Sequence, residues 1–272
     1  MKILGIFASP RKLGNSEICV KEILRTLPQQ WEKESINLSR LQLQPCKACY
    51  ACLPQGKSCV LDDDLKLVLT KVREADRVII AAPVYFLGQQ TSVKLLTDRL
   101  ISILNEGELY SLQKPCVIVI PHAIKGWEGY AREAMLNFAA FLGLKVLDCR
   151  VLNKMLPGDV ADEEGLKVLH SLALELAQDR ETDWSRGTEL LCPICHSSLL
   201  QLHKDKSWRC VMCDSVGTLL ESAGQLRLAV TAAPNLRFSP EGLAHHGQVL
   251  LNVNKEFIQR RREVIAHLKP YK

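Results

Sequence analysis

The sequence lacks the features that would place it in a membrane, in a secretory pathway or among repeat proteins. Its longest uninterrupted apolar stretch is VIIAAPVYFLG, residues 78–88, which is too short to cross a bilayer. The apolar run near the start, in MKILGIFASPRK, is too short for a signal-peptide core followed by a cleavage site. No internal repeat or low-complexity segment is visible. We therefore expect a cytoplasmic protein with no membrane partner.

A strong excess of charge of one sign is also lacking. The net charge is +5 at pH 7, the pI is about 8.6, and the basic residues are scattered along the chain. No surface that combines aromatic and basic residues is apparent, so the composition argues against nucleic acid as a partner. The one basic cluster, Arg260–Arg262, falls in an expected helix and is typical of a solvated helix face.

What the chain does contain is cysteine: 11 in 272 residues, most of them in two tight groups. The first group has the spacing C-x2-C-x2-C-x6-C and consists of Cys46, Cys49, Cys52 and Cys59. Disulfides are not expected in a cytoplasmic chain, where thiols stay reduced. Four thiolates so close together can hold one [4Fe–4S] cluster. Zinc and unligated thiols are the alternatives, although zinc ligands more often come as two separated C-x2-C pairs.

The second group has that zinc spacing, C-x2-C-x14-C-x2-C, and consists of Cys192, Cys195, Cys210 and Cys213. The two pairs predict a zinc ribbon, with a hairpin between them and a metal that supplies the folding free energy of so small a unit. A single redox-active iron is the alternative. The other cysteines fall in expected core segments and are interpreted as small apolar residues: Cys19, Cys116 and Cys149.

Residues 1–180 alternate short apolar runs with amphipathic segments. The expected strands are KILGIFA, ESINLS, RVIIAAP, CVIVIPH and KVLDCRVL, and the expected helices are 15–27, 64–74, 91–105, 128–142 and 162–178. Strand–helix alternation predicts a doubly wound α/β fold with a parallel sheet, and five strands fit the flavodoxin-like order 2-1-3-4-5. Beyond it we expect a polar linker at 181–189, the ribbon at 190–230, and a tail at 231–272 with a helix at 246–268.

The loop after the first expected strand is suited to a phosphate monoester. A strand-to-helix turn directs free backbone N–H groups at one point, and the helix dipole adds positive potential there. The loop residues that can add hydrogen bonds or charge are Ser9, Arg11, Asn15 and Ser16. The loop is neither G-x-G-x-x-G nor a Walker loop, so a dinucleotide site is not indicated. An ordinary helix cap with solvated basic residues is the simpler interpretation of this loop alone.

A second segment follows the third expected strand. It is apolar and aromatic, and its central residues are Pro83, Val84, Tyr85 and Phe86. Ligands of this fold bind outside the carboxyl ends of the strands, beside the switch between the first and the third. A phosphate loop on one side and an aromatic loop on the other would suit a planar ring system with a phosphate tail. Core packing is the alternative for Val84 and Phe86.

Four motifs together resemble a known family. SPRKLGNS, the cysteine loop, DDD at a helix start and APVYFLGQQTSVKLLTDR look like the NAD(P)H-dependent FMN reductases of flavodoxin-like fold, over about residues 1–150. The cysteine loop makes the chain most similar to the iron–sulfur flavoproteins among them. The resemblance implies that the first loop holds the FMN phosphate, that residues 83–86 border the isoalloxazine ring, and that the first cysteine group ligates the cluster. It also implies a homodimer or tetramer with flavin sites near subunit boundaries.

One stretch departs from the family pattern. Where such proteins often have a glycine-rich loop after the fourth strand, this chain has PHAIKGWEG, residues 121–129. His122 and Trp127 are candidates to cover the flavin or to occupy space used elsewhere by a nicotinamide. His122 could also protonate a reduced flavin, although a histidine in a loop is more often a simple surface group.

The resemblance and the cysteine spacing lead to one functional hypothesis and two rivals. The hypothesis is an iron–sulfur flavoprotein oxidoreductase that passes electrons between a [4Fe–4S] cluster and FMN, with ferredoxin or NAD(P)H as the donor. The first rival is an NAD(P)H-dependent FMN or quinone reductase without an iron–sulfur cluster. The second is a redox-sensing adaptor that binds a partner or nucleic acid through the zinc ribbon.

Overall fold

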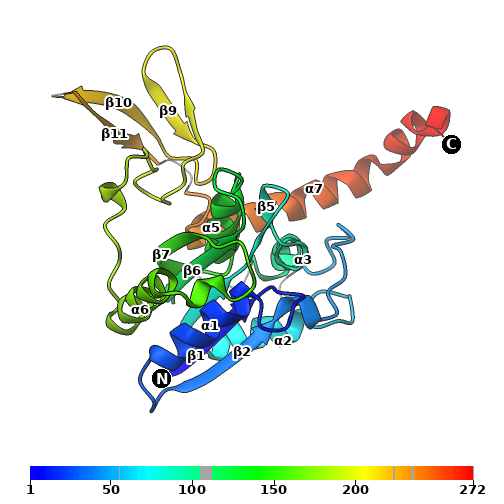
Figure 1. The fold of residues 1–272 in the computed structure, drawn as a ribbon. Helices are drawn as coiled ribbons and strands as arrows, with labels where there is room; N and C mark the ends of the chain where they lie inside the picture. The colour runs from blue at the N-terminus through cyan, green and yellow to red at the C-terminus, as the bar shows by residue number, and fades with distance from the viewer. Residues whose placement is uncertain (55, 105–111, 223, 234–235, 272) are drawn as a thin grey trace.

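A five-stranded parallel sheet forms the centre of the molecule in the computed structural model (Figure 1). Its strands are β1 (Lys2–Phe7), β2 (Glu32–Asn37), β3 (Arg77–Ala81), β6 (Lys114–His122) and β7 (Leu144–Asn153). Their order in the sheet is β2-β1-β3-β6-β7. This is the 2-1-3-4-5 order expected from the sequence, so the doubly wound, flavodoxin-like fold is confirmed. The edge strand expected at ESINLS is β2, although it begins two residues earlier and ends at Asn37, where a turn of 3-10 helix (Leu38–Arg40) follows.

The structure describes residues 1–54, 56–104, 112–222, 224–233 and 236–271. Some expectations extend beyond these ranges. Residue 55 of the cysteine loop, residue 105 of the expected helix 91–105, residue 223 of the expected ribbon, and residues 234–235 and 272 of the tail lie outside the described residues.

Helices cover both faces of the sheet. They are α1 (Asn15–Thr26), α2 (Leu65–Glu74), α3 (Thr91–Arg99), α5 (Ala131–Phe141) and α6 (Glu163–Gln178). Apolar residues of α1 and α6 pack on one face, and those of α2, α3 and α5 pack on the other. Helix α1 lies so close to β1 that a Cβ on Gly5 would be 2.2 Å from Val20. The fold therefore needs glycine at this position.

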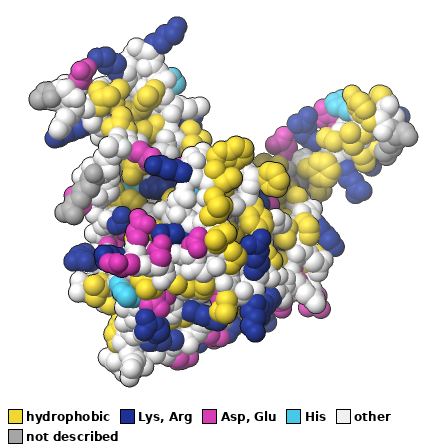
Figure 2. Space-filling view, in the orientation of Figure 1, with side chains coloured by type: hydrophobic (Ala, Val, Ile, Leu, Met, Phe, Trp, Pro, Cys, Tyr) yellow, Lys and Arg dark blue, Asp and Glu magenta, His cyan; other side chains and the backbone are white. Residues whose placement is uncertain are grey.

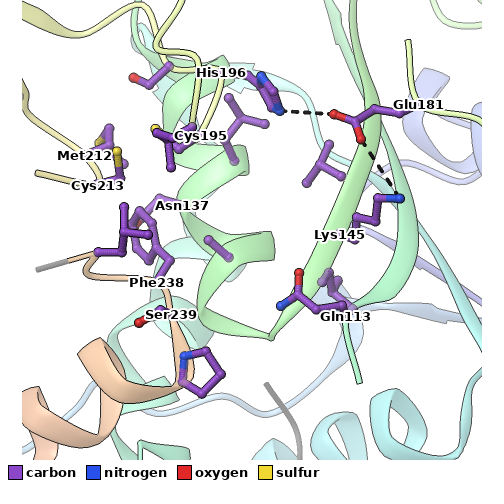
Figure 3. Close-up of a pocket in the computed structure, with 18 residues that line it drawn as sticks. Gln113, Asn137, Lys145, Glu181, Cys195, His196, Met212, Cys213, Phe238 and Ser239 are labelled. Atoms are coloured by element: carbon purple, nitrogen blue, oxygen red, sulfur yellow. Dashed lines mark ion pairs between the residues drawn. The ribbon is translucent and has the colours of Figure 1, made fainter. Parts of the chain in front are cut away.

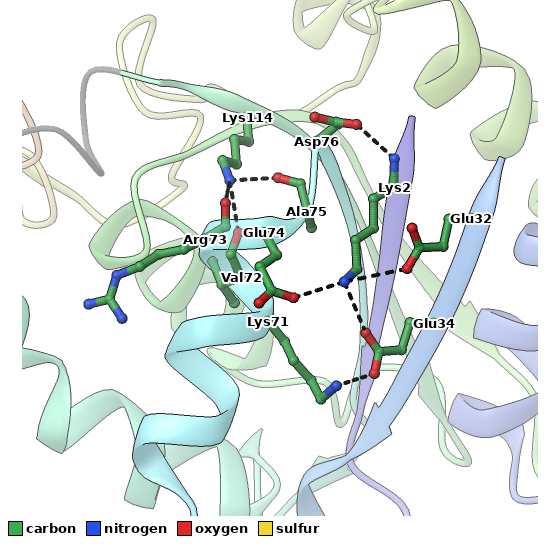
Figure 4. A network of polar contacts seen from close by, with 10 residues as sticks. All are labelled: Lys2, Glu32, Glu34, Lys71, Val72, Arg73, Glu74, Ala75, Asp76 and Lys114. Carbon is green, nitrogen blue, oxygen red and sulfur yellow. Dashed lines mark hydrogen bonds and ion pairs between the residues drawn. The ribbon is translucent and has the colours of Figure 1, made fainter.

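Charged side chains join the amino-terminal edge of the sheet to α2 (Figure 4). The Lys2 ammonium donates a hydrogen bond of 2.8 Å to Glu74 and forms an ion pair with Glu32 at 3.5 Å. The buried Lys114 ammonium donates to the carbonyls of Val72 and Ala75, at 2.9 and 2.6 Å, where α2 ends. Lys114 thus satisfies carbonyls that the helix itself leaves without partners. These contacts fix the end of the sheet opposite to the expected site.

The second cysteine group lies in a separate antiparallel sheet. Its strands are β8 (Leu200–Leu202), β9 (Ser207–Cys210), β10 (Val216–Ser222) and β11 (Gln225–Ala232). Strands β8 and β9 form the expected hairpin between the two cysteine pairs. Trp208 of β9 is buried and lies so close to β10 that a Cβ on Gly217 would be 2.8 Å from its ring. Strand β11 extends two residues beyond the expected boundary at 230.

The C-terminal helix is longer than the sequence indicated. Helix α7 spans Pro240–His267, whereas the expected start was residue 246. The Ser239 hydroxyl accepts a hydrogen bond of 3.0 Å from the Gly242 amide, and Pro240 occupies the first turn. Ser-Pro at this point is an N-cap followed by a residue that needs no amide partner. The distal part of α7 projects away from the sheet and carries exposed apolar side chains (Figures 1 and 2).

The ribbon is attached to the α/β domain through side chains of α5. Arg132 donates a hydrogen bond of 2.8 Å to the carbonyl of His196, and the Ser198 hydroxyl donates one of 2.8 Å to Glu133. Phe141 at the end of α5 packs edge-to-face against Phe238. Among the described residues, no helix is both long enough and apolar enough to span a membrane.

Candidate functional site

A hollow of about 180 Å³ lies at the carboxyl ends of β1, β3 and β6. It collects residues from four segments that are far apart in the sequence. Of the residues expected at a flavin site, those that line it are Ser9, Arg11, Asn15, Ser16, Pro83, Val84, Tyr85 and His122. This is the position at which ligands bind in open α/β sheets.

The first loop holds the amino end of α1 open toward this hollow. The cap residue of α1 is Gly14, which provides no side-chain cap, so first-turn amides of the helix are available to an anion. A Cβ on Gly14 would be 2.3 Å from the Ser9 hydroxyl. That hydroxyl donates to the Arg11 carbonyl at 2.9 Å, and the Asn37 amide donates to the Ser9 carbonyl at 2.8 Å. The loop is therefore rigid, and its chemistry fits a phosphate.

Asn15 has a role that the sequence did not reveal. Its side-chain amide donates to the carbonyls of Lys154 and Leu156, at 3.3 and 3.0 Å, and its oxygen accepts from the Gly158 amide at 2.8 Å. Asn15 thus ties the loop after β7 to the first loop. That later loop adds Lys154, Met155 and Pro157 to the lining of the hollow. The switch-point rule pointed only to the loops after the first and third strands, so these residues were missed.

The aromatic segment is a small hairpin formed by β4 (Val84–Tyr85) and β5 (Gly88–Gln89). Tyr85 lines the hollow, but Phe86 lies at the tip, fully exposed, and is not among the lining residues. Phe86 and Leu87 both have positive φ, +46° and +65°, which is unfavourable for residues with large side chains. The Tyr130 amide donates to the Leu87 carbonyl at 2.8 Å and supports the turn.

The segment after β6 contributes His122 but not Trp127. His122 is buried at the wall of the hollow, and its Nε2 is 3.9 Å from the Glu128 carboxylate. Trp127 is largely exposed and is not among the residues that line the hollow.

The four cysteines of the first group line a second, smaller hollow of about 20 Å³. The fully buried Arg99, at the end of α3, lines it too. Its Nη2 donates to the Cys59 sulfur at 3.2 Å, and its Nη1 forms an ion pair with Asp63. The Arg99 Nε is buried and has no hydrogen-bond partner in the described part of the chain. Four thiols and a buried cation with an unpaired N–H are donor groups whose chemistry suits an anionic metallocluster.

Comparison with known proteins identifies the family. The sequence pattern of the NADPH-dependent FMN reductases matches residues 1–153. The chain belongs to this family.

Relatives of this family member include iron–sulfur flavoproteins. One from Methanocaldococcus jannaschii is 41% identical over 100 residues, which are 36% of this chain and 51% of that protein, so the chain spans about half of that relative's length. A second from the same organism is 33% identical over 195 residues, covering 62% of this chain and 91% of the relative. A solved structure described as a flavone reductase covers 100% of this chain and 96% of its own, with 19% identity and a TM-score of 0.78. That likeness concerns the fold.

This FMN reductase family member also carries a second set of converging thiols. The sulfurs of Cys192, Cys195, Cys210 and Cys213 all lie within 4.8 Å of one another. Cys192 and Cys213 are 3.6 Å apart and Cys195 and Cys210 are 3.5 Å apart, measured between sulfurs. Zinc–sulfur bonds of about 2.3 Å in a tetrahedron place sulfurs roughly 3.8 Å apart, so the donor set fits a structural zinc.

Next to these thiols, a cavity of about 450 Å³ lies between the ribbon, α5 and the start of α7 (Figure 3). Its wall includes Cys195, Met212 and Phe238, with His196 at one side. His196 stacks on Trp184 at 4.3 Å between ring centroids, and its Nε2 is 3.4 Å from Glu181. Burial lowers the pKa of His196 and so favours the neutral ring.

The other cysteines of the family member are buried. Burial raises the pKa of Cys19 and of Cys149 to about 12, and that of Cys116 well above its ordinary value. These thiols stay protonated, which agrees with their interpretation as small apolar core residues.

Proposed function

We propose that the chain is an iron–sulfur flavoprotein oxidoreductase that transfers electrons between a [4Fe–4S] cluster and FMN. The observation that carries the proposal is the gathering of the expected residues around two hollows. All the expected flavin residues except Phe86 line one hollow at the carboxyl edge of the sheet, and the four cysteines line the other. The names of the iron–sulfur flavoprotein relatives support the same assignment.

The chain's own residues bind and orient FMN. The uncapped start of α1 and the Arg11 guanidinium attract the phosphate, while Ser9 keeps the loop in shape. Pro83, Val84 and Tyr85 border the ring. His122 can hold a proton at its ring nitrogen beside the flavin. When bound, FMN exchanges two electrons or one and the cluster exchanges one at a time, so the pair can interconvert the two kinds of transfer.

Three further assignments belong to this proposal. The second cysteine group binds zinc and stabilises the ribbon. The electron donor is a reduced ferredoxin or NAD(P)H. The protein acts in the cytoplasm, where thiolate ligands stay reduced, and it assembles as a homodimer or tetramer through the apolar surface beside the flavin hollow. That surface includes exposed Tyr85, Phe86, Trp127, Tyr130 and Met155.

The test follows flavin reduction by absorbance in anaerobic, cofactor-loaded protein, with reduced ferredoxin and NADPH as alternative donors. The wild type is compared with Cys49→Ser, which removes one exposed ligand, and with Ser58→Ala, a control in the same loop. We expect Cys49→Ser to keep FMN and to lose most of its reduction by ferredoxin, while Ser58→Ala behaves as the wild type.

A different pattern would favour the simple reductase. If ferredoxin does not reduce the wild type, and NADPH reduces Cys49→Ser as fast as the wild type, electrons reach FMN without a cluster. The cysteine loop would then have no part in electron transfer.

A further inference from the structure

Arg99 is a buried cation in contact with a thiol of the first cysteine group, and no role follows for it from the flavin chemistry. It is the last residue of α3, it is 1% exposed, and it lies in the wall of the four-cysteine hollow. Its Nη2 donates to the Cys59 sulfur at 3.2 Å. A fully buried guanidinium is rare unless it is paired, so its partners indicate what it is for.

One of those partners is Asp63, which is itself held in place. The two side chains are each 1% exposed and form an ion pair. The Asp63 carboxylate also accepts hydrogen bonds from two backbone amides, that of Gln44 at 2.9 Å and that of Leu65 at 3.2 Å. The Gln44 carbonyl in turn accepts from Arg99 at 3.3 Å. The guanidinium is therefore fixed in one orientation before any cofactor binds.

These contacts leave part of Arg99 unused. Its Nε is buried without a hydrogen-bond partner in the described ranges of the chain. The Asp63 carboxylate balances the single positive charge of Arg99. The cysteines beside Arg99 would add several negative charges when they are deprotonated. A buried donor with nothing to bind is costly, and an anion in the hollow would remove that cost.

We propose that Arg99 is a positioning residue that sets the reduction potential of the cluster, with Asp63 opposing it. The inference rests on the proposed function. Uptake of one electron adds one negative charge to the cluster, and a fixed cation with an N–H bond to a ligand sulfur favours that reduced form. A fixed carboxylate at the same place disfavours it. The pair therefore determines how readily the cluster accepts an electron from its donor.

The experiment measures the midpoint potential of the cluster by anaerobic, EPR-monitored redox titration of the full chain. Arg99→Gln removes the cation and should lower the potential, whereas Asp63→Asn removes the anion and should raise it. We expect each change to alter the reduction equilibrium about tenfold, which is roughly 59 mV for a one-electron couple. Arg99→Lys keeps the positive charge but lacks the planar guanidinium with its several N–H donors. Its midpoint potential should lie between those of the wild type and Arg99→Gln.

Lys94 provides the matched control. It is on the same helix, is exposed, and pairs with Asp98 at the surface, so Lys94→Gln should leave the potential unchanged. Opposite shifts for Arg99→Gln and Asp63→Asn support the proposal, because a purely structural pair would not give shifts of opposite sign. Shifts of the same sign, or none in loaded protein, overturn it. If the wild-type protein purifies anaerobically without iron and sulfide, that result would instead overturn the proposed function.

Discussion

Gly14 lies where the first loop meets α1, and a side chain there would collide with the loop. A Cβ would be 2.3 Å from the Ser9 hydroxyl, which holds the loop through the Arg11 carbonyl. We predict that Gly14→Ala costs about 1–3 kcal/mol of folding free energy through overpacking. It should also weaken FMN binding by about tenfold, which corresponds to 1.4 kcal/mol. Denaturant unfolding and flavin fluorescence titration measure the two effects.

Gly187 provides the control for this substitution. A Cβ there would meet no atom nearer than 3.8 Å, and the residue lies in the segment that leads to the ribbon. Gly187→Ala should leave FMN affinity unchanged. Equal flavin affinity in Gly14→Ala and the wild type would mean that the first loop does not hold the phosphate.

Glu175 makes stability depend on pH. Burial, and then the charge of Asp148, raise the pKa of this carboxyl. The folded chain therefore holds the proton more tightly than the unfolded chain, so stability is greatest below the ordinary glutamate pKa of about 4.3 and falls as pH rises through the higher folded value. Glu175→Gln cannot ionise and should be more stable than the wild type at pH 7, with the difference shrinking toward pH 4.

Thermal unfolding between pH 4 and pH 8 tests this prediction. Glu163, on the same helix, is exposed and pairs with Lys167, so Glu163→Gln should show no comparable pH dependence. A Glu175→Gln variant that parallels the wild type at every pH would show that this carboxyl is not protonated preferentially in the folded state.

Residue roles were only partly predictable. Residue types and spacing pointed to Ser9, Arg11 and Tyr85, and these line one hollow. The bonds from Asn15 to the loop after β7, and the contact of Arg99 with Cys59, depend on chain packing across long sequence separations. No local pattern carries that information.

The β4–β5 hairpin combines an unfavourable backbone conformation with an exposed side chain. Phe86 has a positive φ and a fully exposed ring, so its side chain has little to stabilise it within the chain. We predict that Phe86→Asn is more stable than Phe86→Ala by about 1 kcal/mol, because asparagine tolerates left-handed backbone better. Denaturant unfolding at low protein concentration compares the two.

The same two variants test whether the ring serves association. Both remove it, so both should shift the proposed homo-oligomer toward smaller species in sedimentation velocity. Unchanged association in both would exclude Phe86 from the subunit contact and would leave its exposure without a role.

Elements with strong patterns were predicted well, and element ends less so. Continuous apolar runs predicted β1, β3 and β6, because a strand covered on both faces needs apolar residues at every position. The edge strand β2 and the strand β7 have polar residues within them and were predicted from weaker patterns. The start of α7 was wrong by six residues, since Ser239 and Pro240 form a cap whose signal is local and lies outside the apolar repeat.

The ribbon should unfold independently of the α/β domain when its metal is removed. The ribbon has a small core around Trp208, whereas the α/β domain has two large ones. We predict that a thiol-blocking mercurial releases one zinc per chain and exposes Trp208, while most of the helical circular dichroism remains. Exposure of Trp208 should change the tryptophan fluorescence of the wild type, and Trp208→Phe should lose that change. Loss of helical signal in parallel with zinc would show that ribbon and domain unfold together.

We infer that one chain carries both a flavin and an iron–sulfur cluster. Counting iron, acid-labile sulfide, zinc and flavin in a single anaerobically purified sample tests this inference. We predict about four iron and four sulfide per chain, with about one FMN and one zinc. A yellow protein that contains FMN and two zinc ions, with neither iron nor sulfide, would contradict the claim.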